Sequence, residues 1–183
     1  VERPTYSKYI IPTTWFGNGI AFYGNYSGFN FRLAIMEDLE GENIFYKGNI
    51  RDGRGKGYKT TGINLLKNLS ASYTGINGLR IGGSLTLNNA PLADDNEEAS
   101  SDSTIAVQLY EINAKYDANN FYAVFEYGKS GFNYDGANLP GYLNDDDETV
   151  IWSDFSSSGY YFDLGYNIGG FINTNKLIPW VRI

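Results

Sequence analysis

The sequence contains no cysteine and no histidine, and it contains a single methionine. Without these residues the chain cannot build a Cys/His zinc site, a thiol nucleophile or a nucleophile that depends on an imidazole base. Zero cysteines leave the redox compartment undetermined, because only their presence would be informative. Much familiar enzyme chemistry is excluded, and we expect no catalytic residues, no bound metal and no cofactor.

Two further features are absent from the sequence. The net charge of -7 leaves too few clustered cations for the phosphate footprint of a general nucleic-acid binder. No stretch approaches 18 consecutive apolar residues, and the opening Val1 to Pro4 is unlike a signal peptide, so we expect no transmembrane helix. A membrane β-barrel stays open, because its strands carry a much weaker sequence signal.

Aromatic residues and glycine are abundant instead. Aromatics make up 16% of the 183 residues, and glycine occurs 22 times. This composition favours strands and turns over helices, and the length suits one substantial domain spanning 1–183. An all-β fold is therefore expected.

Four pairs of strands alternate apolar and polar residues. The turns of the first three pairs are predicted at Ser27-Gly28, at Ile76-Asn77-Gly78 and at Asp117 to Asn120, and the fourth within Gly169 to Lys176. One face is apolar: Phe16, Ile20, Phe22, Tyr26, Phe29, Phe31, Leu33, Ile35, Leu69, Ala71, Tyr73, Leu79, Ile81, Leu85, Leu87, Tyr110, Ile112, Ala114, Tyr116, Phe121, Ala123, Phe125, Tyr127, Tyr160, Phe162, Leu164, Tyr166, Ile168, Leu177, Pro179, Val181 and Ile183. The other face carries mainly polar residues.

The lengths of the connections indicate where such a sheet would lie. Short turns join the strands within each pair, whereas long polar stretches, at about 37–62, 89–103 and 129–158, join the pairs. This arrangement is typical of an outer-membrane barrel, which has short periplasmic turns and long external loops. A soluble jelly roll or lipocalin-like barrel is the alternative, with its apolar face inward. Aromatics at strand ends favour the membrane, but alternation alone does not say which face points out.

Several segments resemble the phosphate-selective porins of the O/P family. They are Glu2-Arg3-Pro4, Ser7 to Trp15, Arg51-Asp52-Gly53-Arg54, Gly159 to Tyr166 and Leu177 to Arg182. The resemblance implies an antiparallel transmembrane barrel of about sixteen strands, of which the roughly eight strands here are an internal portion. It also implies basic channel residues that pass anions, a location in the outer membrane of a Gram-negative bacterium, and an assembly that is often trimeric.

Five cations gather in the first long connection: Lys47, Arg51, Arg54, Lys56 and Lys59. Folded into a lumen, they would form a positive constriction that attracts anions, whereas outside a barrel they would be a solvated loop. The segment from Gly53 to Thr60 is not a P-loop, because Tyr58 interrupts the Gly-Lys-Thr order and no crossover helix follows.

Seven charged residues fall on the polar strand faces and are predicted to line the lumen. They are Arg32, Arg80, Lys115, Arg182, Glu111, Glu126 and Asp163. The three carboxylates weaken the case for phosphate selectivity, and these charges could simply pair with one another and hydrate the wall.

One pair of carboxylates suggests an enzyme. If Tyr116 faces Phe121, Glu111 lies directly opposite Glu126, and two carboxylates across a cleft are the equipment of a retaining glycosidase. Neutralisation by Lys115 or a neighbouring Arg is the simpler interpretation.

Acidic residues crowd the other two long connections: Asp94, Asp95, Glu97, Glu98, Asp102, Asp135, Asp145, Asp146, Asp147, Glu148 and Asp154. They could bind divalent cations that bridge to lipopolysaccharide, or they could be ordinary solvated loops. Their spacing is not that of an EF-hand.

The sequence thus predicts an outer-membrane porin for small hydrophilic solutes, with a mild preference for anions. Its expected partners are outer-membrane lipid, lipopolysaccharide and small anionic or polar solutes, and nucleic acid is not among them. The alternatives are a non-conducting barrel in an envelope assembly, and a soluble β-protein that binds or cleaves carbohydrate.

Overall fold

The structure is a computed structural model of the 183-residue chain. It describes residues 10–11, 16–47, 49–58, 61–92, 100–134, 142–143, 149–150, 154–172 and 176–183. Side chains are described for these residues except 45–47, 100–103, 134, 142–143 and 149–150.

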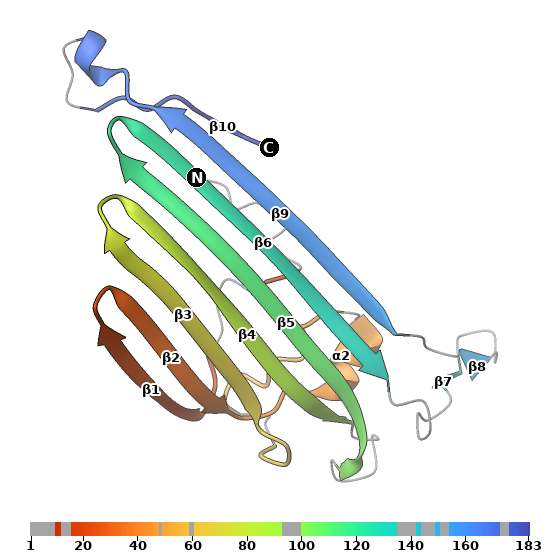
Figure 1. The fold of residues 1–183 in the computed structure, drawn as a ribbon. Helices are drawn as coiled ribbons and strands as arrows, with labels where there is room; N and C mark the ends of the chain where they lie inside the picture. The colour runs from red at the N-terminus through yellow and green to blue at the C-terminus, as the bar shows by residue number, and fades with distance from the viewer. Residues whose placement is uncertain are drawn as a thin grey trace.

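The described chain is almost entirely β-structure. The main sheet has eight antiparallel strands in the order β1-β2-β3-β4-β5-β6-β9-β10, so neighbours in the sheet follow one another along the chain (Figure 1). The strands are β1 Gly19–Tyr26, β2 Phe29–Met36, β3 Leu66–Ile76, β4 Leu79–Leu92, β5 Ser100–Ala118, β6 Phe121–Tyr134, β9 Phe155–Tyr166 and β10 Trp180–Arg182. A small separate hairpin pairs β7 Tyr142–Leu143 with β8 Thr149–Val150, and the helical segments are α2 Gly41–Lys47 and the 3-10 turn η1 Gly169–Phe171.

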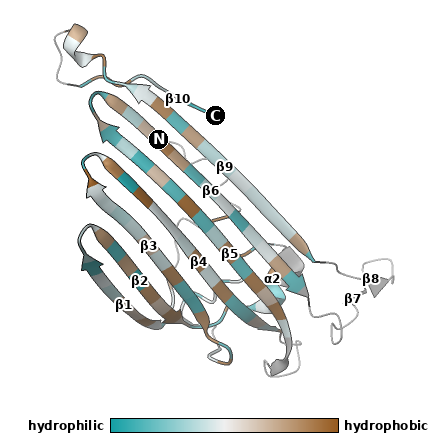
Figure 2. Cartoon of the chain, viewed as in Figure 1, coloured by the Kyte–Doolittle hydropathy of each residue, from teal (hydrophilic) through white to brown (hydrophobic). Residues whose placement is uncertain are grey.

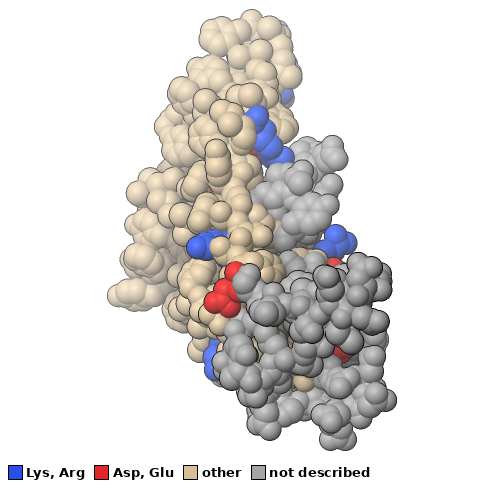
Figure 3. Space-filling view, turned by 90° about the vertical axis from the view of Figure 1, so that its right-hand side faces the viewer, with Lys and Arg blue, Asp and Glu red and all other residues tan. Residues whose placement is uncertain are grey.

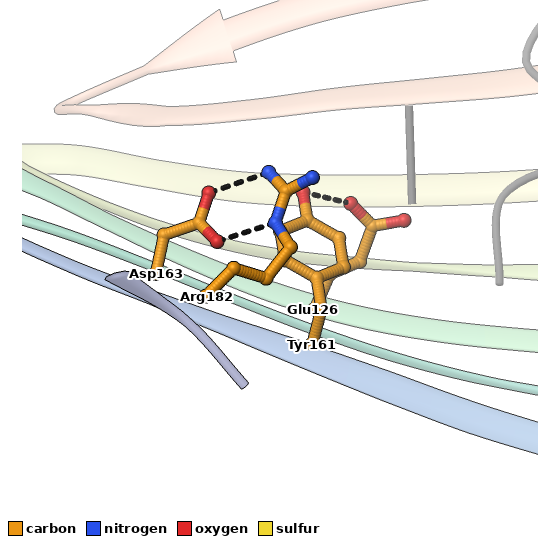
Figure 4. Close-up of polar contacts among 4 residues, drawn as sticks. All are labelled: Glu126, Tyr161, Asp163 and Arg182. Carbon is orange, nitrogen blue, oxygen red and sulfur yellow. Dashed lines mark hydrogen bonds and ion pairs between the residues drawn. The ribbon is translucent and has the colours of Figure 1, made fainter. Parts of the chain in front are cut away.

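The sheet is curved but open. Within the part of the chain that the structure describes, β1 and β10 are its two edges and do not pair with each other. The sheet bends so that β1 and β2 lie opposite β9 and β10 across its concave side (Figures 1 and 4). The expected all-β antiparallel fold is therefore confirmed, whereas closure into a barrel is not part of this structure.

Tight turns join the first three strand pairs at one end of the sheet, as predicted (Figure 1). Ser27 and Gly28 have φ values of 48° and 85°, and Asn119 and Asn120 have values of 52° and 66°. Two successive positive φ values define the type I′ turn, whose twist matches that of the flanking strands. The second turn is tighter than predicted, because Ile76 pairs directly with Leu79 and leaves only two residues between them.

The other connections differ in length from those expected. The strands β4, β5, β6 and β9 extend beyond the predicted ends, so the second and third long connections shrink to 93–99 and 135–154, whereas the first runs slightly further than predicted, over 37–65. The β9 to β10 connection, 167–179, is longer than predicted because it holds η1. The backbone NH of Ile168 donates to the backbone oxygen of Leu177 at 2.9 Å, so the two ends of this connection lie close together.

The strand registers confirm the predicted faces and show which one points outward. The face that holds Phe22, Leu33 and Ile81 is exposed on the convex side of the sheet. The polar face lies on the concave side, where the 37–65 connection packs. Alternating polar and apolar residues run along most strands (Figure 2).

A small hydrophobic core lies on the concave side, near the long connections. The helix α2 packs against β4 and β5 there. The buried members of this core are Ile10, Leu39, Ile44, Ile50, Leu66, Ala90, Ile105, Val107, Leu109 and Phe132. Burial of these aliphatic side chains holds the 37–65 connection against the sheet.

Candidate functional site

The concave face carries a continuous row of polar side chains. Arg32 on β2 donates from Nη2 to Asn68 Oδ1 on β3, and Asn68 Nδ2 donates to Thr86 Oγ1 on β4 at 2.9 Å. This chain of hydrogen bonds joins β2, β3 and β4, because the register places Asn68 directly opposite Thr86 and diagonal to Arg32. The Nε of Arg32 is buried and has no hydrogen-bond partner within the described residues.

The row continues on β5 at Glu111. Its two carboxylate oxygens accept from Ser84 Oγ, at 3.2 Å, and from Asn113 Nδ2. These two hydrogen bonds from neutral donors fix the orientation of the Glu111 carboxylate.

A second cluster lies where β6, β9 and β10 meet (Figure 4). Arg182 binds Asp163 through two parallel hydrogen bonds of 2.6 and 2.7 Å. The guanidinium also lies 4.8 Å from the ring centre of Tyr161 and 5.1 Å from that of Trp180. The hydroxyl of Tyr161 donates to Glu126 Oε2 at 3.0 Å. Figure 4 shows all four polar groups projecting from these strands toward the concave side of the sheet.

Two cations face each other near the tight turns. Arg80 on β4 is directly opposite Lys115 on β5. Like charges in this position repel each other. Lys115 relieves part of the repulsion by pairing with Asp117 at 3.8 Å and by lying 5.7 Å from the ring centre of Tyr122. Both cations are exposed, so this end of the concave face is positively charged.

All seven predicted wall residues thus lie on one face of the sheet. Five of them form direct side-chain hydrogen bonds with other polar wall residues: Arg32, Glu111, Glu126, Arg182 and Asp163. The interpretation that wall charges pair with one another describes Arg182 and Asp163 well. It does not describe Arg80, which faces another cation.

The predicted pair of carboxylates is wrong. Glu126 lies opposite Asn113, and Glu111 lies opposite Gly128. The turn is shorter than the one assumed, since β5 and β6 continue up to the pair Ala118 and Phe121. The register therefore moves by two residues, which separates the carboxylates but keeps every side chain on its predicted face. The geometry proposed for a retaining glycosidase is lost.

The basic cluster lies in the 37–65 connection, and three of its five members are described with their side chains. Arg51, Arg54 and Lys56 line a pocket of about 400 Å³ together with Glu40 and Asp52. Asn43, Asn49, Gly55 and Tyr58 complete its lining. The backbone of Lys47 ends α2, but its side chain and all of Lys59 lie outside the described residues.

Burial and the neighbouring charge of Arg51 lower the pKa of Arg54, and Asp52 partly opposes this effect. The Nε of Arg54 donates to the backbone oxygen of Arg51 at 2.7 Å. Leu39 and Arg54 also form an isolated antiparallel bridge. The cations are therefore held in a folded segment against the concave side of the sheet.

A buried aspartate that the sequence analysis missed fixes this segment to the sheet. Asp38 is 2% exposed and accepts hydrogen bonds from the backbone NH groups of Ile63 and Asn64, at 2.7 and 3.0 Å. Asn88 on β4 donates to Asp38 at 2.8 Å and accepts from the backbone NH of Leu39 at 2.8 Å. The two ends of the connection are thus joined to each other and to β4.

Most of the acidic residues of the other connections lie outside the described residues. These are Asp94, Asp95, Glu97, Glu98, Asp135, Asp145, Asp146, Asp147 and Glu148. Asp102 lies in β5, not in a loop, and its side chain is not described. Asp154 accepts a hydrogen bond from Asn133 at 2.9 Å. The described residues contain no group of three or more His, Cys, Asp or Glu that could hold a metal ion.

Comparison with known proteins gives no match: no family model, curated protein or solved structure is similar to the chain. No helix among the described residues is long and apolar enough to cross a membrane.

Proposed function

We propose that this chain is part of an outer-membrane porin of a Gram-negative bacterium, similar to the phosphate-selective O/P family. The channel passes small hydrophilic solutes by diffusion and has a mild preference for anions. Its lipid-facing surface contacts outer-membrane lipid and lipopolysaccharide, and its assembly is a homotrimer.

The exposed apolar convex face carries this proposal. Phe22, Phe31 and Ile112 are 58%, 51% and 54% exposed, and they belong to a face that continues across every strand of the sheet. Soluble monomers rarely expose apolar patches larger than a few hundred Å². A sheet with apolar residues outside and polar residues inside has the polarity of a membrane barrel, in which lipid covers the outer face.

The open edges support a larger barrel. An open sheet edge leaves backbone NH and CO groups unpaired, which is not tolerated in the hydrocarbon region of a bilayer. The edge strands β1 and β10 therefore need further strands beside them, and a closed barrel of about sixteen strands would supply these. The lumen of a barrel of that size would be wide enough for solutes.

Anion preference follows from the position of the cations. Arg51, Arg54 and Lys56 lie in the segment that packs on the concave side, and Arg80 and Lys115 lie near the tight turns. Both sets of cations would border the path of a solute through the lumen of the completed barrel. Glu111 and Glu126 lie between the two sets, and Asp163 is level with Arg80 and Lys115, so the preference is weaker than in a dedicated phosphate channel.

Single-cysteine labelling tests the facing of the strands, and each variant carries one thiol because the chain has no cysteine. Cysteines at Phe31, Leu85 and Phe125 should react with lipid-soluble reagents in the reconstituted protein. Cysteines at the neighbouring positions Arg32, Ser84 and Glu126 should react with water-soluble ones. The reverse pattern, or recovery of the protein from cells without detergent, contradicts the proposal and favours a soluble carbohydrate-binding β-protein.

One observation favours a second function. The hydrophobic core beneath the 37–65 connection fills part of the concave side, as a plug would. A non-conducting barrel within an envelope assembly would also have this feature. Conductance of the purified protein in a planar bilayer separates the two functions, because only the porin gives ion currents.

A further inference from the structure

The longest strand, β5, changes the direction in which it points its apolar residues. Between Tyr110 and Ala118 the apolar side chains point to the convex side, as Ile112 does at 54% exposure. Toward the long connections, Ile105, Val107 and Leu109 point to the concave side, where they are at most 5% exposed. Gln108, between the last two, is exposed on the convex side. The change occurs between the adjacent residues Leu109 and Tyr110.

The neighbouring strands change within two residues of this level, since Leu69 is level with Tyr110, Leu87 with Gln108, and Tyr127 and Tyr160 with Ile112. Convex apolar residues end at Leu69 on β3, Leu87 on β4, Tyr127 on β6 and Tyr160 on β9. Beyond these positions the same convex rows continue with polar or charged residues: Lys67, Asn89, Lys129, Asn133, Ser156 and Ser158. On the concave side the hydrophobic core begins there, with Leu66, Ala90 and Phe132. The change therefore forms a line across five strands.

Tyrosine hydroxyls mark both limits of the convex apolar zone on β5. The hydroxyl of Tyr110 donates to Gln108 at 2.6 Å, so it is directed toward the long connections. Asn119, in the tight turn, donates to the hydroxyl of Tyr116 at 2.8 Å, so that hydroxyl is directed the opposite way. Tyrosine at a membrane surface places its ring in the apolar layer and its hydroxyl in water.

Cations follow immediately beyond the line. Lys67 comes next after Leu69 on the convex side of β3, and Lys129 comes next after Tyr127 on β6. Both are exposed. In Figure 3 the upper left part of the surface shows no charged atoms, and blue and red atoms appear lower on that side, while further blue atoms lie in the upper third toward the right. Ammonium groups here complement the phosphates of lipid headgroups.

We propose that the bilayer ends at the line formed by Leu69, Leu87, Tyr110, Tyr127 and Tyr160, and that the strands continue beyond it as a water-exposed layer with its own core. This inference rests on the proposed function and names the lipid surface that the convex face contacts. The zone from Tyr110 to Ala118 fits the roughly nine to eleven residues that a membrane strand needs. Beyond the line the sheet has the polarity of an ordinary water-soluble domain, since its core lies under the 37–65 connection.

The test measures fluorescence quenching along the convex face of the complete protein in vesicles. A polarity-insensitive fluorophore is attached to single cysteines at Ile112 and Leu164, inside the zone, and at Gln108 and Ser158, beyond the line on the same face. A fifth variant at Asn113 serves as a control, because it lies beside Ile112 but on the concave face. Quenching by brominated phosphatidylcholine reports contact with lipid, and quenching by iodide reports contact with water.

The proposal expects brominated lipid to quench roughly half or more of the emission at Ile112 and Leu164, and little at the other three positions. Iodide should quench Gln108, Ser158 and Asn113. If brominated lipid quenches Gln108 and Ser158 as strongly as Ile112, the bilayer extends past the line and this inference is wrong, while the proposed function survives. If it quenches none of the four convex positions, the proposed function fails as well.

Discussion

Arg182 donates two hydrogen bonds, of 2.6 and 2.7 Å, to the carboxylate of Asp163, and this ion pair joins the three-residue strand β10 to β9. Asp163 is 4% exposed, so water screens the interaction only weakly. A short edge strand has few backbone hydrogen bonds of its own. The ion pair and the contact of Arg182 with Tyr161 therefore hold β10 in register.

Replacement of Asp163 by Asn should destabilise the protein by about 2–4 kcal/mol, because it removes a buried carboxylate and leaves the partly exposed guanidinium of Arg182 without its counter-charge. Arg182→Lys should cost less, since a lysine keeps the charge but loses the parallel pair of hydrogen bonds. Urea unfolding in detergent measures both effects. Lys115→Gln is the matched control: its ion pair is exposed and 3.8 Å long, so its removal should change stability by less than about 1 kcal/mol. Equal effects of Asp163→Asn and Lys115→Gln would contradict the structural role of the buried pair.

Asp38→Ala should release the 37–65 connection from the sheet. The substitution removes the acceptor of two backbone NH groups and leaves Asn88 without its partner, at a cost of about 2–4 kcal/mol. Hydrogen exchange of the Ile63 and Asn64 amides should become faster by an order of magnitude or more. Asp52→Asn is the control, because Asp52 is exposed and bonds only within its own turn in the contacts described. Unchanged exchange in Asp38→Ala would show that the hydrophobic core alone holds the segment.

The register of β5 and β6 can be tested by engineered disulfides. Residues directly opposite each other in an antiparallel pair have Cβ atoms about 4.5–5.5 Å apart, whereas diagonal neighbours are too distant for a disulfide. Cysteines at Asn113 and Glu126 should therefore cross-link under mild oxidation. Cysteines at Glu111 and Glu126 should not. Efficient cross-linking of the second pair would restore the register that the sequence analysis assumed.

The basic cluster should govern the ion preference of the channel. Joint replacement of Arg51, Arg54 and Lys56 by Gln should shift the zero-current potential in a salt gradient toward cation preference. Joint replacement of Asp145, Asp146 and Asp147 by Asn should hardly move it, because the sequence predicts that they lie in an outer loop, where charges are screened beyond about 8 Å at physiological salt. Single-channel recordings give both values. A larger shift in the acidic-loop variant would mean that the basic cluster does not line the narrowest part of the path.

The sequence predicted the faces of the sheet more reliably than its registers. Alternation assigns Phe125 and Glu126 to opposite faces wherever the turn begins. Pairing depends on the turn itself, and the run Asp117 to Asn120 contains three turn-forming residues, of which only Asn119 and Asn120 have positive φ. The assumed turn was therefore two residues too long. The faces survived the error because the shift was even.

The concave core and the Asp38 anchor were missed for a different reason. The alternation assigns residues to both faces, but the predicted strands begin at Tyr110 on β5 and end at Tyr127 on β6, so the buried residues beyond these positions were left out. The adjacent pair Leu109-Tyr110, with apolar residues continuing in both directions on opposite faces, was the available signal. No sequence pattern marked Asp38, because its partners Ile63, Asn64 and Asn88 are far from it along the chain.

The switch between Leu109 and Tyr110 also bears on how the protein is made. No single solvent covers both halves of β5: in water, Val107 and Leu109 can collapse onto Ile44 while Ile112 stays uncovered. The half near the long connections can therefore fold early, before the other half meets its final environment. During that interval the uncovered half exposes apolar side chains and unpaired strand edges to water. Binding by a holding chaperone would keep such an intermediate from aggregating.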